Sequence, residues 1–186
     1  MRIARKQWWL LFILLLVLSL TGCGSGEQQA QVSEHPAMSI TVTGSDGVAH
    51  KVDLNQLTPV TLRGGYKKST GTIVGPDAVT GVKFSDIVEL IGGWQGIKAM
   101  DVHAADGYGM TLTADQLQGR VEAYDLKGND LGIKQFEVLL IFDSPTAELM
   151  NVSPRLAFVG DNLSYGPLWV QQVASITAAK EPAADK

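Results

Sequence analysis

Apolar and polar residues alternate along much of the chain after residue 38, which predicts short β-strands. The first predicted strand covers residues 39–44, and an Asp-Gly turn at 46–47 leads to a partner strand over 48–54. A third strand is predicted over 59–67. The remaining strands are predicted from the same alternation and turn residues, and they cover residues 97–105, 108–112, 119–126, 131–133, 137–142, 155–159 and 168–178. Among them, the run 137–142 is apolar throughout, which is typical of a buried central strand.

Two stretches have helical signals. Residues 84–93 carry apolar side chains at helical spacing, and Ser85 or Asp86 caps the predicted N-terminus. Thr113 and Gln116 have the spacing of a capping box, which predicts a second short helix. Short strands and few short helices, without regular βαβ alternation, predict an α+β domain with a mixed, mainly antiparallel sheet.

Residues 68–82 are rich in glycine, threonine, serine and proline, and they predict a long loop. Loops of this length inside a domain are often functional. The neighbouring run "GGYKKST" invites comparison with a phosphate-binding P-loop, but Lys67 stands where that motif requires glycine. A P-loop is therefore excluded.

The N-terminus has a different pattern. Arg2, Arg5 and Lys6 precede an uncharged apolar run of 13 residues over 8–20. This run is shorter than the roughly 20 residues that a membrane-spanning helix needs. A secretory signal is the favoured interpretation, and an uncleaved membrane anchor is the alternative.

The tetrapeptide "LTGC", which ends at Cys23, resembles the bacterial lipoprotein signal. The resemblance implies a diacylglyceryl group on Cys23 and cleavage just before it. We therefore expect a signal peptide over 1–22 and a flexible tether over 23–37. A folded domain over 38–178 and a disordered tail over 179–186 complete the expected organisation. The lipid would hold the domain on the extracytoplasmic side of the cell membrane or outer membrane.

Charge and cysteine content exclude several classes of function. The part of the chain after Cys23 has 12 basic and 19 acidic residues, a net charge of −7, and no basic run with interleaved aromatics. Nucleic acid is therefore not an expected partner. The single cysteine excludes an intramolecular disulfide, a cysteine-based zinc site and an iron–sulfur centre.

Few residues carry the signs of catalysis. A serine hydrolase is disfavoured because the chain has no Gly-x-Ser-x-Gly elbow. Asp101 and His103 share one face of a predicted strand, and with Asp106 they form a conceivable metal site. The favoured interpretation is that His103 is a half-buried strand residue and Asp106 part of a turn.

The order of several segments resembles a known family. The segments run "TGVKFSDIVELIGG", "VHAADGYGMTLTADQL", "AYDLKGNDL", "PRLAFVGD" and "YGPLWVQQVASI". This order is similar to that of the molybdopterin-binding oxidoreductase domain of sulfite-oxidase type. The resemblance implies a cleft between sheet and loops. It also implies a cysteine thiolate on molybdenum, from the loop before the Thr-Gly-Val turn, and basic residues that hold the pterin phosphate.

This chain departs from that pattern, because the loop over 67–79 has no cysteine. A serine alkoxide at Ser69 is a disfavoured substitute, since its ionisation is costly. We therefore expect no cofactor, with molybdopterin as the alternative. If a pocket persists, the residues expected to line it are Ser69, Thr70, His103, Asp106, Tyr108 and Tyr165.

Three functional hypotheses remain open from the sequence. The first is a non-catalytic, membrane-tethered module that binds a small ligand or an envelope protein. The second is a molybdopterin-dependent oxidoreductase with an atypical metal ligand. The third is an extracytoplasmic protein that binds or senses a small anion, which the acidic charge disfavours.

Overall fold

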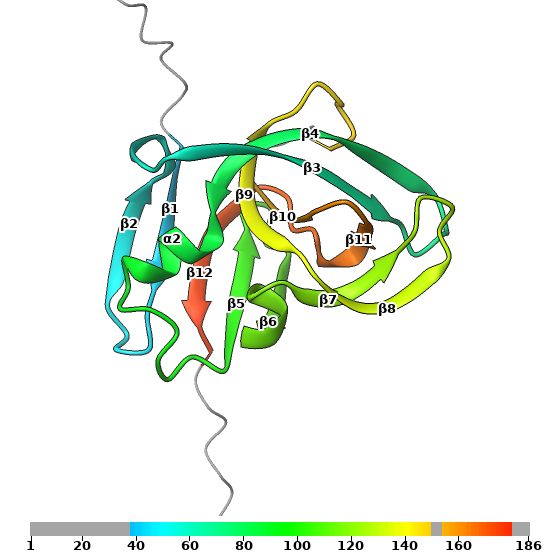
Figure 1. The fold of residues 1–186 in the computed structure, drawn as a ribbon. Coiled ribbons are helices and arrows are strands. Elements are labelled where there is room, and N and C mark those ends of the chain that lie inside the picture. Colours follow the sequence, from blue (N-terminus) through cyan, green and yellow to red (C-terminus); the bar gives the residue numbers. More distant parts are fainter. Residues whose placement is uncertain (1–37, 150–153, 180–186) are drawn as a thin grey trace, which may run out of the picture. The chain divides into compact units, whose positions relative to one another are not determined.

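The computed structural model describes residues 38–149 and 154–179 (Figure 1). These residues belong to one compact unit. The predicted signal peptide, the whole predicted tether and residues 180–186 of the predicted tail lie outside the described residues. Ala179, which we expected to begin the tail, donates its backbone N–H to Ala99 O at 2.9 Å.

Five strands form the first sheet, in the order β2-β1-β12-β5-β6. β1 pairs with β12 in parallel, and the other neighbours are antiparallel. The strands are β1 (Ser39–Thr43), β2 (Ala49–Asp53), β5 (Ala99–Ala104), β6 (Gly109–Thr113) and β12 (Val173–Ala178).

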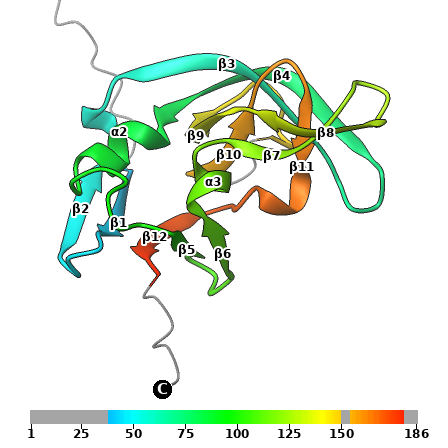
Figure 2. The ribbon, with the colours of Figure 1, turned by 60° about the horizontal axis from the view of Figure 1, so that its bottom comes forward.

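Seven strands form the second sheet, in the order β10-β9-β4-β3-β11-β7-β8. Only β11 and β3 pair in parallel. In both ribbon views the long strands β3 and β4 arch over the other strands of this sheet (Figures 1 and 2). The strands are β3 (Pro59–Lys67), β4 (Ile73–Lys83), β7 (Arg120–Tyr124), β8 (Asp130–Gln135), β9 (Glu137–Asp143), β10 (Arg155–Val159) and β11 (Leu163–Tyr165).

The second sheet curls back on itself. Gly160, which follows β10 at one end of the strand order, donates its backbone N–H to Arg63 O in β3 at 2.8 Å. This contact brings the β10–β11 connection next to the middle of β3. The curl is what places residues from distant parts of the chain around one groove.

The described residues contain two short α-helices, α2 (Phe84–Glu89) and α3 (Ala114–Leu117). Short 3-10 turns cover Leu54–Gln56 and Gly166–Leu168. Neither helix is long and apolar enough to cross a membrane. The capping box predicted for α3 is confirmed, with the Thr113 hydroxyl accepting from Gln116 N. The cap predicted for α2 is wrong: Lys83 is the N-cap, without a side-chain hydrogen bond.

The predicted α+β class is also wrong. Strands make up 53% of the structure and helical turns 12%, so the fold is β-rich with two sheets. The main reason lies in residues 68–82, which we expected to be a loop but which fold from Ile73 onwards as β4. Gly75 and Pro76 interrupt the alternation and hide the strand, yet β4 pairs with β3 on one side and with β9 on the other.

The predicted strand over 168–178 is only half right. Leu168 belongs to a 3-10 turn, and β12 begins at Val173. Between them Gln172 has a φ of 50°, a conformation that strands do not contain. The hairpin predicted over 39–54 is confirmed as β1 and β2.

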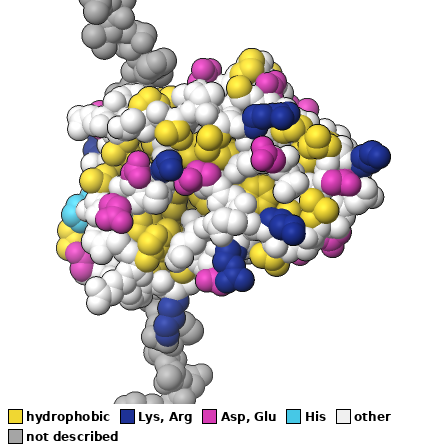
Figure 3. Space-filling view, in the orientation of Figure 1, with side chains coloured by type: hydrophobic (Ala, Val, Ile, Leu, Met, Phe, Trp, Pro, Cys, Tyr) yellow, Lys and Arg dark blue, Asp and Glu magenta, His cyan; other side chains and the backbone are white. Residues whose placement is uncertain are grey.

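The core is continuous across both sheets. β9 lies between β10 and β4, and its residues Val138–Ile141 are buried, as the apolar run predicts. Phe84, Ile87 and Val88 of α2 add to the same cluster. On the face shown in Figure 3, acidic and basic side chains are interspersed, and no patch of one sign dominates.

Candidate functional site

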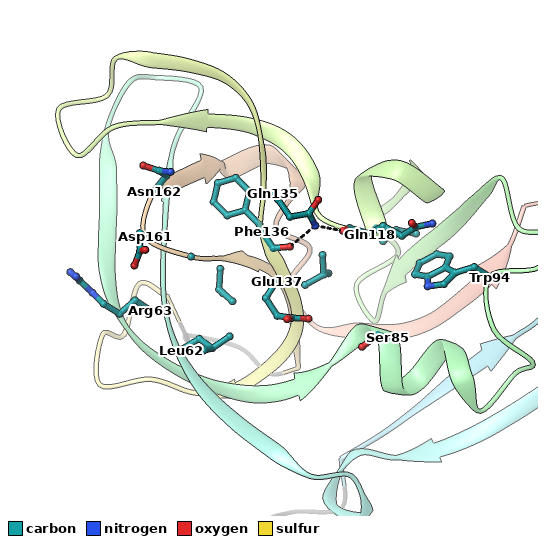
Figure 4. Close-up of a pocket in the computed structure, with 14 residues that line it drawn as sticks. Leu62, Arg63, Ser85, Trp94, Gln118, Gln135, Phe136, Glu137, Asp161 and Asn162 are labelled. Atoms are coloured by element: carbon teal, nitrogen blue, oxygen red, sulfur yellow. Dashed lines mark hydrogen bonds between the residues drawn. The ribbon is translucent and has the colours of Figure 1, made fainter.

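An elongated, open groove with a volume of about 700 Å³ lies between the curled sheet and the segments around the two helices (Figure 4). Its walls come from β3, α2, the chain after α2, the end of α3, the β8–β9 junction and the β10–β11 connection. The lining residues are Leu62, Arg63, Ser85, Trp94, Leu117, Gln118, Gln135, Phe136, Glu137, Val138, Val159, Gly160, Asp161 and Asn162.

Trp94 and Gln118 mark one end of the groove (Figure 4). Trp94 is partly buried, and its ring packs at 6.0 Å from the ring of Phe84 with a tilt of 44°. Phe84 is fully buried at the start of α2 and therefore fixes the indole from behind. An aromatic surface held in this way is a ready contact for an apolar ligand face.

The middle of the groove is fixed by Gln135. Its Nε2 donates to Gln118 O at 2.5 Å and to Phe136 O at 3.1 Å, which ties the end of α3 to the β8–β9 junction (Figure 4). Glu137 follows, with Oε2 accepting from Lys83 Nζ at 3.3 Å. This ion pair balances the Glu137 charge within the site.

The opposite end carries Arg63, Asp161 and Asn162 (Figure 4). Arg63 and Asp161 are exposed and Asn162 is half-buried. Within the described part of the chain, the side chains of Asn162 and Gln118 make no hydrogen bond. Both ends of the groove therefore present amide groups with their full donor and acceptor capacity.

An apolar strip runs between these polar groups. Val138 and Val159 are buried, and Leu62 remains 38% exposed. A few polar groups converging over an apolar floor are typical of ligand sites. The groove is thus suited to hold a ligand, and it contains no thiol, since the only cysteine of the chain is Cys23.

The residues predicted from the sequence to line a pocket lie at three separate places. Ser69 and Thr70 are exposed in the β3–β4 turn. His103 is exposed on β5, with its ring against Gly109. Asp106 and Tyr108 lie in or next to the β5–β6 turn beside it. There the Asp106 carboxylate accepts from Tyr108 N at 2.9 Å.

Tyr165, the last of the predicted residues, lines a second recess of about 490 Å³ with Arg120, Glu122 and Ile133 among its walls. Nearby, burial raises the pKa of Tyr124, and the hydrogen bond from its hydroxyl to Glu122 at 3.1 Å contributes to the rise. None of the six predicted residues lines the groove.

The donor set around the β3–β4 turn does not fit a molybdenum centre of the family that the sequence resembles. The turn offers hydroxyls in place of a soft thiolate, and Thr70 and Thr72 share a hydrogen bond of 3.3 Å. The lysines that could meet a phosphate are engaged elsewhere: Lys67 Nζ donates to Gly128 O at 2.8 Å, and Lys68 pairs with Glu148.

Asp101 does not combine with its neighbours into a metal site. Its carboxylate accepts from the Thr111 hydroxyl at 2.5 Å. Within residues 38–149 and 154–179, no group of three His, Cys, Asp or Glu side chains is arranged to hold a metal ion.

Sequence reasoning missed a buried arginine as well as the groove. Arg155 is 3% exposed, and its guanidinium lies 5.0 Å from the centre of the Tyr66 ring and 5.1 Å from that of Trp169. Its Nη1 donates to the backbone oxygens of Glu148 and Leu149, and its Nε has no hydrogen-bond partner among residues 38–149 and 154–179. The stacking explains how this charge is held in the core.

Only some of the groove residues could have been singled out from the sequence. Ser85 and Asp161 lie within segments on which the family resemblance rests, but Leu62 and Asn162 carry no such signal. Neither a protein-family model nor a curated protein matches this chain. The site must therefore be interpreted from its own geometry.

Proposed function

We propose that this protein is an extracytoplasmic, lipid-anchored binding module that holds a ligand in the groove between Arg63 and Trp94 without catalysing a reaction on it. The observation that carries the proposal is the groove itself. It combines a fixed aromatic surface, an apolar strip and two amides that make no hydrogen bond within the described part of the chain. The thiolate required by the resembled enzymes is missing from the domain.

The lipid anchor rests on the leader of the sequence. A basic start, a short apolar run and the tetrapeptide that ends at Cys23 support acylation of that cysteine. Acyl chains on Cys23 would keep the domain at the membrane surface, with residues 24–37 as the spacer. In this proposal the anchor determines where the protein is located, and the groove binds the ligand.

Two measurements test the proposal. The wild-type protein, expressed in a bacterium fed an alkyne-labelled fatty acid, should carry the label in the membrane fraction, and Cys23→Ala should carry none. The mature domain, produced in a host that makes molybdenum cofactor, should fold without molybdenum by elemental analysis. Stoichiometric molybdenum with pterin fluorescence would establish the oxidoreductase alternative, and an unlabelled wild-type protein would remove the anchor.

A further inference from the structure

The charges around the groove cancel. Arg63 and Asp161 stand at one end, and Glu137 at the centre is paired with Lys83 at 3.3 Å. Among the lining residues Arg63 offsets Asp161, and Lys83, which does not line the groove, offsets Glu137 through the ion pair. A groove without net charge offers no electrostatic advantage to an anion or a cation, although the mature chain as a whole is acidic. The preferred ligand is neutral.

The groove is also rich in planar side chains that both donate and accept hydrogen bonds. Gln118 and Asn162 lie at opposite ends, and their side-chain amides make no hydrogen bond to any other described residue. The Asp161 carboxylate lies beside Asn162 in Figure 4. Amide and carboxylate groups each offer two polar atoms in one plane, which match the spacing of neighbouring hydroxyls on a ring. A neutral ligand for this site should carry many hydroxyls.

The remaining surface is apolar and partly aromatic. The indole of Trp94 is fixed by Phe84, and the Leu62 side chain is 38% exposed in the groove wall. A ring with a polar edge and a C–H face can hydrogen-bond to the amide and carboxylate groups and pack against the apolar and aromatic surface at the same time.

From these three properties we infer that the groove binds a neutral oligosaccharide, with a sugar ring on Trp94 and ring hydroxyls on Gln118 at one end and on Asp161 and Asn162 at the other. The inference rests on the proposed function, since it names the ligand class of the same site.

The test is a titration of the ¹⁵N-labelled mature domain with cellotetraose, maltotetraose and chitotetraose, followed by NMR. We expect at least one of them to bind in the millimolar range or tighter and to shift the indole signal of Trp94 together with the amide signal of Asn162. Gln118→Ala and Asn162→Ala should each weaken binding about tenfold, as expected for one lost hydrogen bond in a bound complex.

Gln95→Ala is the matched control, because Gln95 is an exposed amide next to Trp94 that does not line the groove, and its binding should equal wild type. No shift with any of the three sugars would overturn the inference. So would shifts outside the groove, or preferential binding of a lysine-rich peptide or a polygalacturonate tetramer at the same residues. Molybdenum content and Cys23 acylation, measured on the same preparations, report separately on the proposed function.

Discussion

At the scale of single residues, Arg155 is the most unusual feature of the core. A buried charge is normally paired with a carboxylate, but Arg155 relies on two aromatic rings and two backbone oxygens. We expect Arg155→Ala to lower the free energy of unfolding by about 3 kcal/mol, from the cavity and the unpaired oxygens of Glu148 and Leu149. Urea denaturation followed by tryptophan fluorescence measures the change.

The control is Arg63→Ala, because Arg63 is exposed and its side chain makes no hydrogen bond within the described residues. This variant should stay within about 0.5 kcal/mol of wild type. Equal stability of the two variants would show that the stacked guanidinium contributes nothing to the fold.

Asp125 gives a prediction about pH. The side-chain amide of Asn129 donates to its carboxylate at 2.7 Å, and the backbone N–H groups of Asn129 and Lys127 add further bonds. These bonds hold the pKa of Asp125 below its ordinary value of 3.8. Because the folded pKa is lowered, the stabilising effect is present above the ordinary value and is lost as the pH falls through the folded value.

Asn129→Ala removes the largest of these contributions, so the pKa of Asp125 should rise towards 3.8. An NMR titration of the Asp125 carboxyl carbon in acid measures the shift, and Gln95→Ala, at an exposed position in the segment after α2, serves as a control with no expected change. An unaltered Asp125 titration in Asn129→Ala would mean that the turn is held in another way.

At the scale of elements, the tight pairing of β4 with β9 depends on Gly81. A Cβ at this position would lie 2.4 Å from Leu140 O and 2.7 Å from Ile141 Cα, both backbone atoms of β9. We expect Gly81→Ala to force the strands apart and to lower the free energy of unfolding by about 3 kcal/mol, as overpacking does in a core.

Gly160→Ala is the matched control, because its Cβ would meet only the Phe136 ring at 3.4 Å, an ordinary contact. Denaturation of both variants in urea should separate them clearly. If Gly81→Ala is as stable as Gly160→Ala, the close approach of β4 and β9 is not required by the fold.

Local signals explain which elements could be predicted. The β1–β2 hairpin and the capping box of α3 depend on residues a few positions apart, and both are confirmed. β4 was missed because Gly75 and Pro76 break its pattern while its partner β9 supplies the pairing from far along the chain. The groove was missed for the same reason, since its walls meet only after β10 folds against β3.

At the scale of the whole molecule, the proposed ligand site and the proposed membrane anchor belong to different parts of the chain. The groove lies in the described domain, whereas the proposed anchor at Cys23 lies outside it and is joined to it by residues 24–37. The only thiol of the chain would be consumed by acylation. This division supports a tethered binding module over a redox enzyme that needs a thiolate ligand.

Native mass spectrometry of the wild-type protein, extracted in detergent from bacterial membranes, tests this account most directly. The account predicts a chain that begins at Cys23, carries a diacylglyceryl group on that residue and has no molybdenum cofactor bound. A chain that still begins at Met1, or a folded protein with a stoichiometric cofactor, would contradict it.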